Sequence, residues 1–399
     1  MMIKKRPYKL FNKIQNYAWG TKNDSAFIPQ FLGMEFEPGL PYAELWIGAH
    51  PKSPSEIIID GQKIKLNELI DKFPKQLLGV YISEKFNNEL PFLLKVLSAG
   101  TALSIQAHPD KKLAKVLHQK DPKNYPDENH KPEIAITLDT LSAVVGFRPF
   151  EEIEKVLSDY QILKELIEPD ILNKESNSES DREAFVKMVY ESIMKADQNK
   201  IEIIIEEIRR TILKRHSPDN NEQQFLLQYE NYGCDIGLIS ILLFNLIELS
   251  ENDAIFTGAG IPHAYIKGNI VECMANSDNV IRAGLTPKFK DIDTLVEMLD
   301  YKLAVPPITQ RNSDVCFEYT TSAEEFQVKS FQFRPGDSLN FESKNRISII
   351  LITEGEVEFK TEIDSQNFRK GESILIPAIL ENFKITSISR SHLFEISVP

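Results

Sequence analysis

The sequence predicts a mainly β protein with an α-helical insert, built from double-sheet jelly rolls. Short apolar runs broken by Gly and Pro dominate residues 1–150 and return after about residue 250, as expected for strands bounded by turns. Between these regions the sequence becomes rich in Glu and Lys, with apolar residues near helical spacing. In the last third, residues 251–263 and 371–381 each place an apolar strand before a Gly/Pro turn, which is how small jelly rolls are built.

The first region is predicted to be mostly strand. Residues 56–61 form an apolar run that ends at a Gly turn signal, and residues 91–97 form an almost continuous apolar run. Both are therefore predicted to be strands bounded by turns.

Helical periodicity begins after Phe150, where Ile153, Val156 and Leu157 recur at the spacing of one helix face. The most apolar stretch of the chain, residues 236–249, closes this region. It is shorter than the ~20 residues that span a bilayer, so we expect a buried helix there.

Three units follow from these changes of pattern. Residues 1–150 and 250–310 form a first β-unit, residues 151–249 a helical insert, and residues 311–399 a C-terminal β-unit. Within the insert, the charged and polar run at 174–181 is predicted to be a mobile surface loop. A single helix, at about 293–299, is expected to interrupt the returning strands.

The two hairpin-like stretches differ at one position. The first ends in His263, whereas the second has Glu381 and Asn382 at about the same place. We therefore predict that the C-terminal unit holds no metal and has a structural role.

Length and composition are those of an ordered globular protein that is large enough for an enzyme, with 399 residues, 42% hydrophobic and 26% charged. Lys+Arg 46 against Asp+Glu 59 gives a net charge of −13, which argues against a nucleic-acid or membrane partner.

The basic N-terminus is not followed by an apolar segment, so no export signal is expected. Cys234, Cys273 and Cys316 lie far apart without C-x-x-C spacing, which fits a reducing cytoplasm and no thiolate zinc site.

Four residues suggest a metal site. Gln106 and His108 follow a strand-like run and, being two apart, face the same way. Glu133 lies on a segment that Pro132 keeps extended, and His263 supplies a second imidazole. Such a donor set suits Zn²⁺, although geometry rather than affinity separates it from Fe, Mn or Co. A single histidine is more often a core or surface residue, and spacing alone does not prove that these four converge.

A series of motifs resembles, in the same order, the type I mannose-6-phosphate isomerases. They are residues 17–20, 43–51, 103–110, 121–127, 129–133, 262–265 and 277–288. The resemblance is strong over about 8–150 and 225–300, and weak towards the C-terminus. It implies that the first unit is a catalytic cupin barrel and the last a second, cupin-like one. It also implies one Zn²⁺ per chain, held by Gln106, His108, Glu133 and His263.

The resemblance further implies an active-site arginine and a set of pocket residues. The arginine is Arg282; Lys95, Ser104, Lys131 and Lys288 match positions near the substrate and its phosphate; and Glu44, His130, Tyr265, Glu272 and Asp278 match other pocket positions. Ordinary surface charge is the alternative for the lysines, and a core role is the alternative for Trp19 and Trp46.

An enzyme of this family interconverts mannose 6-phosphate and fructose 6-phosphate by opening the sugar ring and moving a proton between C1 and C2 through a cis-enediol. Arg282 is assigned to stabilising the enediolate, because a guanidinium stays protonated. Glu272 is the first candidate for the base, His130 and Lys131 are the others, and His130 also suits ring opening. The expected partner is a small sugar phosphate, and the chain is expected to be monomeric.

Three other functions remain open from the sequence. They are a non-catalytic cupin that binds a sugar phosphate, an Fe(II) cupin oxygenase, and an isomerase of another sugar phosphate. The cations Lys131, Arg282 and Lys288 have no evident purpose in an oxygenase.

Overall fold

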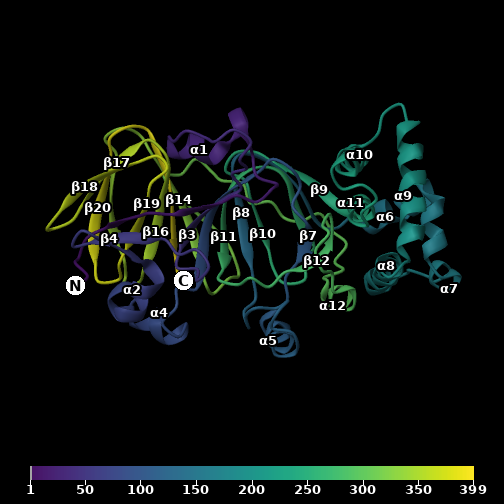
Figure 1. Cartoon of the computed structure of the whole chain (residues 1–399), viewed down its shortest axis with the longest axis horizontal. Helices are drawn as coiled ribbons and strands as arrows, with labels where there is room; N and C mark the ends of the chain where they lie inside the picture. The colour runs from purple at the N-terminus through teal and green to yellow at the C-terminus, as the bar shows by residue number, and fades with distance from the viewer. Residues whose placement is uncertain (1) are drawn as a thin grey trace.

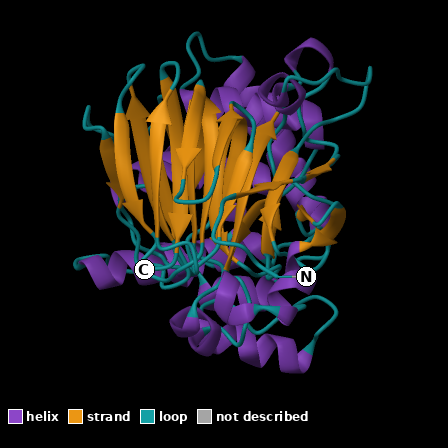
Figure 2. Cartoon of the chain, turned by 90° about the vertical axis from the view of Figure 1, so that its left-hand side faces the viewer, coloured by secondary structure: helices purple, strands orange, loops and turns teal. Residues whose placement is uncertain are grey.

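The computed structural model describes residues 2–399. Figure 1 shows three parts side by side along the long axis: the last strands of the chain at one end, a sheet containing β3, β8, β10 and β11 in the middle, and helices α6–α11 at the other end. Figure 2 looks from the end that carries the last strands, which stand next to one another with helices behind and below them.

The middle part is a nine-stranded antiparallel sheet, called here the central sheet. Its path runs β10-β8-β11-β6-β3-β2, with β9 paired to β8, and with β7 paired to β11 and β12. The strands are β2 (Lys13–Gln15), β3 (Glu44–Gly48), β6 (Phe92–Ala99), β7 (Ile105–Ala107), β8 (Glu133–Phe147), β9 (Phe244–Leu249), β10 (Ala254–Thr257), β11 (His263–Ala275) and β12 (Ile281–Gly284). The long β8 and β11 connect most of the other strands and so bring segments distant in sequence together.

The last residues form a sandwich of a six-stranded and a four-stranded sheet, called here the C-terminal sandwich. The larger sheet contains β1 (Tyr8–Leu10), β13 (Cys316–Tyr319), β14 (Gln327–Phe333), β16 (Ser348–Glu354), β19 (Ser373–Ile376) and β21 (Ser391–Ser397). The smaller contains β15 (Ser338–Glu342), β17 (Glu356–Lys360), β18 (Ser365–Arg369) and β20 (Asn382–Ser387). The strand β1 pairs with β19, so a strand from the start of the chain lies in the sheet of its end.

Alternation of side chains decides what each face of the central sheet packs against. Val96 and Val271 share one hydrophobic core with Ile349 and Phe394 of the C-terminal sandwich. The intervening residues, such as Lys95, point to the opposite face. One face of the central sheet is therefore covered by the sandwich, and the other is available for chemistry.

Helices occupy the connection between β8 and β9 and several shorter connections. Between these strands lie α6 (Phe150–Asp159), η2 (Gln161–Leu166), α7 (Pro169–Leu172), α8 (Glu179–Met194), α9 (Gln198–Leu213), α10 (Asn220–Tyr232) and α11 (Gly237–Leu243). The others are η1 (Asn23–Ser25), α1 (Phe27–Leu32), α2 (Leu66–Lys72), α3 (Pro74–Leu77), α4 (Val80–Lys85), α5 (Lys111–Lys120) and α12 (Ile292–Met298). The hairpin β4 (Glu56–Ile59) and β5 (Gln62–Lys65) precedes α2.

Two expectations from the sequence were wrong in part. Residues 236–249 are not one helix: α11 ends at Leu243, and Phe244–Leu249 forms β9. The side chain of Asn245 donates to the backbone oxygens of Val145 and Phe147, which helps to hold this segment in the sheet. The first region is also less purely β than expected, because α1–α5 lie between its strands.

The polar run at 174–181 is partly helical. The side chain of Ser178 caps α8, whose first turn contains Glu179 and Asp181, so a capping box begins the helix inside this run. The remaining segment, 174–178, lies outside regular structure.

Cys234, Cys273 and Cys316 are all free thiols. Within residues 2–399, no helix combines the length and apolar character needed to cross a membrane.

Candidate functional site

Charged residues gather on the face of the central sheet that the C-terminal sandwich does not cover. In register, Lys95 of β6 lies between Trp46 of β3 and Glu272 of β11, so these three side chains share a face. Met274 follows Glu272 by two residues in β11 and therefore points to the same face. Glu133 of β8 lies opposite Met274 and shares that face. Alternation in β6, β8 and β11 therefore brings the charges from three strands together.

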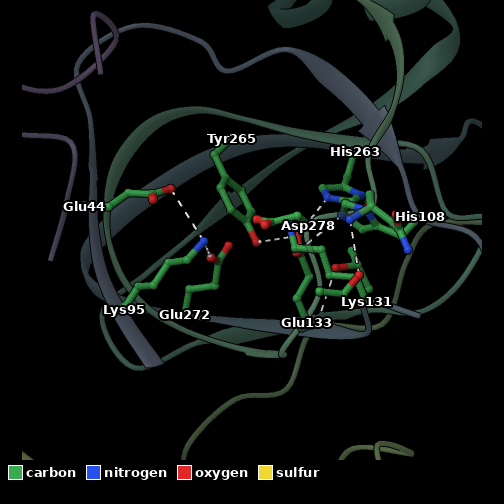
Figure 3. Close-up of polar contacts among 12 residues, drawn as sticks. Glu44, Lys95, His108, Lys131, Glu133, His263, Tyr265, Glu272 and Asp278 are labelled. Atoms are coloured by element: carbon green, nitrogen blue, oxygen red, sulfur yellow. Dashed lines mark hydrogen bonds and ion pairs between the residues drawn. The ribbon is translucent and has the colours of Figure 1, made fainter. Parts of the chain in front are cut away.

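His108, Glu133 and His263 form a buried cluster whose possible ligand atoms all lie within 4.8 Å of one another (Figure 3). Nε2 of His263 is 2.8 Å from Oε1 of Glu133, and Nε2 of His108 is 3.4 Å from Oε2. The side chains are at most 1% exposed.

Backbone carbonyls set the tautomer of both imidazoles. Nδ1 of His108 lies 2.8 Å from the carbonyl oxygen of Asn279, and Nδ1 of His263 lies 2.9 Å from that of Ile261. A carbonyl only accepts, so Nδ1 carries the hydrogen in each ring and Nε2 presents a lone pair towards Glu133.

This arrangement fits a divalent cation. Among the described residues, both Nε2 atoms and Oε2 of Glu133 are buried without a hydrogen-bond partner. Two lone pairs and a carboxylate facing one another at this distance are unfavourable alone and are satisfied by a metal ion between them. Gln106 neighbours this cluster through the backbone, since it lies opposite His263 in the register of β7 and β11.

The charge states suit the same role. Burial and the nearby Lys131 lower the pKa of His108 to about 4, so this imidazole is neutral near pH 7. Burial favours the protonated form of Glu133, but the charge of Lys131, whose Nζ lies 3.4 Å away, holds its pKa well below the usual range. A neutral imidazole and an ionised carboxylate are the forms that bind metals.

Beside this cluster, Lys95 connects two carboxylates (Figure 3). Its Nζ lies 2.9 Å from Glu272 and 3.6 Å from Glu44, whose other oxygen accepts a hydrogen bond from Nε1 of Trp46. Burial acts to lower the pKa of Lys95, but the two carboxylates outweigh it and raise that pKa. Burial raises the pKa of Glu272 even though Lys95 opposes the shift.

Tyr265 joins the two groups of charges. Its hydroxyl donates to Oε1 of Glu133 at 3.3 Å, and burial raises the pKa of Tyr265 well above its ordinary value. The phenol therefore stays protonated and remains a hydrogen-bond donor at neutral pH.

Arg282 lies on β12 opposite Gln106, which in turn lies opposite His263 of the buried cluster. It is half-buried, and burial lowers its pKa. No ion pair joins Arg282 to a carboxylate anywhere in residues 2–399, so its guanidinium is available for an anionic ligand.

Asp278 has partners of its own and lines a cavity of about 500 Å³. Its Oδ2 lies 2.7 Å from Nζ of Lys52 and 3.4 Å from Nε2 of His50. Burial acts against ionisation, but these two partners lower the pKa of Asp278. The cavity is lined by His50, Lys52 and Asp278 but not by the three residues of the buried His–Glu–His cluster.

Three other predicted site residues, His130, Lys288 and Ser104, make no hydrogen bond or ion pair with the described side chains of His108, Glu133 and His263. Nε2 of His130 is paired with Glu325 at 2.8 Å. Lys288 is exposed after β12, and its ammonium makes no ion pair in the part of the chain described. Ser104 is half-buried just before β7, and its hydroxyl has no hydrogen bond to any of residues 2–399.

Sequence reasoning missed Glu325, His50 and Lys52. Glu325 lies 195 residues from His130, and no local pattern signals a pairing over that distance. His50 and Lys52 fall in or beside one of the quoted motifs, 43–51, so a closer look at that segment was the available signal.

Comparison with known proteins shows which family the chain resembles. Residues 8–150 match the model for "Phosphomannose isomerase type I, catalytic domain". The chain is 37% identical over 386 residues to mannose-6-phosphate isomerase of Rattus norvegicus, with 89% of each chain covered. It is 34% identical over 389 residues to mannose-6-phosphate isomerase 2 of Arabidopsis thaliana, covering 92% of this chain and 88% of the plant protein.

The likeness extends to three dimensions. The crystal structure of a mannose 6-phosphate isomerase bound with zinc and yttrium is similar with a TM-score of 0.88 and 29% identity, covering 98% of this chain and 99% of that one. Sequence and fold thus agree over nearly the full length of both proteins, and the chain belongs to the type I phosphomannose isomerase family of enzymes.

Proposed function

We propose that this enzyme interconverts D-mannose 6-phosphate and D-fructose 6-phosphate in a zinc-dependent reaction. The observation that carries the proposal is the buried His108–Glu133–His263 cluster beside the Lys95–Glu272 pair on one face of the central sheet. Relatives that share about a third of their residues with this chain are named mannose-6-phosphate isomerases, which supports the choice of substrate.

The residues proposed to hold one zinc ion per chain are Gln106, His108, Glu133 and His263. When bound there, zinc supplies a Lewis acid that polarises oxygens of the sugar. The Nδ1 hydrogen bonds of the two histidines support this assignment, because they orient each ring and leave Nε2 free to bind.

Proton transfer is assigned to Glu272. Its carboxylate takes the proton from C2 of the open-chain aldose and returns it to C1, while the hydroxyl proton moves from O2 to O1, which yields the ketose. Burial supports this role, because it raises the pKa of Glu272 and makes the carboxylate a better base than an exposed one. Lys95, 2.9 Å away, holds the carboxylate in place.

Arg282 stabilises the negative charge of the enediolate, and Tyr265 remains a neutral donor beside Glu133. Ring opening is assigned to His130, which moves the proton of the O1 hydroxyl to the ring oxygen. Lys131 is the remaining candidate for a proton carrier.

The phosphate is assigned to Ser104, Lys288 and Lys131; the side-chain polar groups of Ser104 and Lys288 have no partner among residues 2–399. Lys95 is engaged with Glu44 and Glu272, which supports a role at the carboxylates rather than at the phosphate.

The finer fold proposal is two cupin-type jelly rolls, only the first of which holds metal. The antiparallel strands of the central sheet and the paired sheets of the C-terminal sandwich support it. The division into 1–150 with 250–310, 151–249 and 311–399 stays a prediction, as do the monomeric state and the cytoplasmic location.

Initial rates with mannose 6-phosphate test the function on protein as purified, after chelation, and after addition of Zn²⁺. We expect turnover that chelation abolishes and Zn²⁺ restores, and much slower turnover of mannose without phosphate. A folded, zinc-loaded sample that does not produce fructose 6-phosphate would contradict the proposal, and another sugar phosphate would then be tried first.

A further inference from the structure

Glu325 belongs to the loop between β13 and β14 of the C-terminal sandwich, yet it contacts a predicted site residue. Its Oε1 lies 2.8 Å from Nε2 of His130, and its side chain is only 7% exposed. The fully buried Phe326 beside it and the buried Ala323 anchor the loop in the core between the sandwich and the central sheet. The carboxylate is thus presented from a fixed backbone.

The backbone on both sides of His130 is also held. The carbonyl oxygen of Asn129 accepts from Oγ of Ser277 at 3.0 Å and from Nδ2 of Asn279 at 2.9 Å. The carbonyl oxygen of Pro132 accepts from the amide of Ala275 at 3.0 Å. With its neighbours bonded to the segment after Glu272, His130 has little freedom except the rotation of its ring.

The contact has the chemistry of an orienting carboxylate. Burial acts to raise the pKa of Glu325. The hydrogen bond with His130 and the charge of Lys111, 3.8 Å from the same oxygen, outweigh burial, so the pKa lies below its ordinary value. An ionised carboxylate only accepts, so Nε2 of His130 carries the hydrogen of this contact, and Nδ1 is the ring nitrogen that the contact leaves free.

We propose that Glu325 is a positioning residue for His130, fixing the tautomer and orientation in which Nδ1 exchanges protons with the sugar during ring opening. This rests on the proposed function. The C-terminal sandwich, which the sequence predicts to be structural, then supplies a side chain on which the reaction depends. The physical model is the carboxylate that orients an imidazole in other proton-transfer sites, where it touches the histidine and not the substrate.

Glu325→Gln and Glu325→Ala test the proposal, with Glu324→Gln as the matched control. Glu324 is the adjacent residue, its side chain is 72% exposed, and its partner is Lys85. We expect kcat for mannose 6-phosphate to fall by about 10- to 100-fold in Glu325→Ala, with KM changed less than about twofold, as for the loss of other residues that orient a histidine. Glu325→Gln keeps the size of the side chain, so a smaller loss of the same kind is expected even if the alanine variant folds poorly.

Two further measurements separate positioning from a structural role. In a His130→Ala background, Glu325→Gln should cause no additional loss, because residues that act through one another are not additive. ¹⁵N spectra of histidine-labelled protein, with the His130 signal assigned by His130→Ala, should show the Nε2–H tautomer in the wild type and its loss in Glu325→Ala. Unchanged kcat in both Glu325 variants, equal losses in the two backgrounds, or an unchanged tautomer would each overturn the proposal. A wild type that does not turn over mannose 6-phosphate would instead refute the proposed function, and the spectra would still test the contact.

Discussion

The two β-regions of this protein have opposite interiors. The face of the central sheet that the C-terminal sandwich does not cover carries Lys95, Glu272 and Glu133, whose side chains are nevertheless less than about a tenth exposed to solvent. The space between the sheets of the C-terminal sandwich is filled by apolar side chains, among them Phe341 and Phe359. Both regions are antiparallel and alternate side chains in the same way. The two regions differ in residue type: charged side chains occupy the uncovered face of the central sheet, and apolar side chains occupy the space between the two sheets of the sandwich.

Buried charge makes this difference informative. Taking a charge out of water costs several kcal/mol unless partners compensate for it, whereas apolar burial stabilises by ~25 cal/mol per Å². A sheet kept for stability alone has no need of Lys95 at the centre of β6, where the residues before and after it in the strand, Leu94 and Val96, are apolar. The comparison therefore predicts that inward substitutions in the central sheet mainly affect activity, and those in the sandwich mainly affect stability.

The largest expected effect compares one buried histidine from each region. His263→Gln removes a proposed metal ligand and should lower kcat/KM on the order of 1000-fold, since a Lewis-acidic ion contributes several kcal/mol. His392→Gln, in the larger sheet of the sandwich, should change kcat/KM by less than about twofold. Steady-state kinetics and bound-zinc analysis of both variants check this. Similar losses in the two would remove the proposed distinction between the regions.

An intermediate effect is expected for Lys95→Met, which keeps the length of the side chain but removes its charge. Glu272 and Glu44 lose their shared partner, so the carboxylate proposed as the base is no longer held. We expect kcat to fall roughly 100-fold while the protein stays folded. The control is Lys329→Met in β14, which should leave kcat unchanged. Full activity in Lys95→Met would show that the charge of this lysine is not needed.

The smallest expected effect concerns pH and stability in the sandwich. Burial, with Arg311 and Arg390 nearby, lowers the pKa of His392 to about 3. Between that value and the ordinary pKa near 6.5, the unfolded chain binds more protons than the folded one, so stability rises with pH. From pH 7 to pH 5 this histidine should contribute a loss of roughly 2 kcal/mol in the free energy of unfolding. Urea unfolding at both pH values should show this loss in the wild type and a smaller one in His392→Gln; equal losses would contradict it.

Local patterns in the sequence singled out three residues, His108, Glu133 and His263, that the structure brings together. Two-residue alternation linked Gln106 with His108, and Pro132 indicated an extended approach to Glu133. The same reasoning did not reveal β9, because an apolar run of that length is compatible with helix and strand until its partner is known. Here the partner is β8, whose own sequence is far away along the chain.

Contacts between distant segments could not be found in this way. The ion pair of Lys95 with Glu272, the pairing of Asp278 with Lys52, and the contact of His130 with Glu325 leave no local periodicity. Each depends on how strands and loops are packed, and a charged residue alone does not indicate which opposite charge it will meet.

The sequence by itself determined which residue types alternate along each strand, the helical connection after Phe150, and the motifs by which the family is recognised. Only the tertiary structure decided which of these residues meet. It directs the Nε2 atoms of His108 and His263 towards Glu133 and places Lys95 between two carboxylates. It also brings Glu325 from the last strands to His130. The reason is physical: chain-local propensities act over a few residues, whereas these contacts depend on register and packing between segments that only the complete fold brings together.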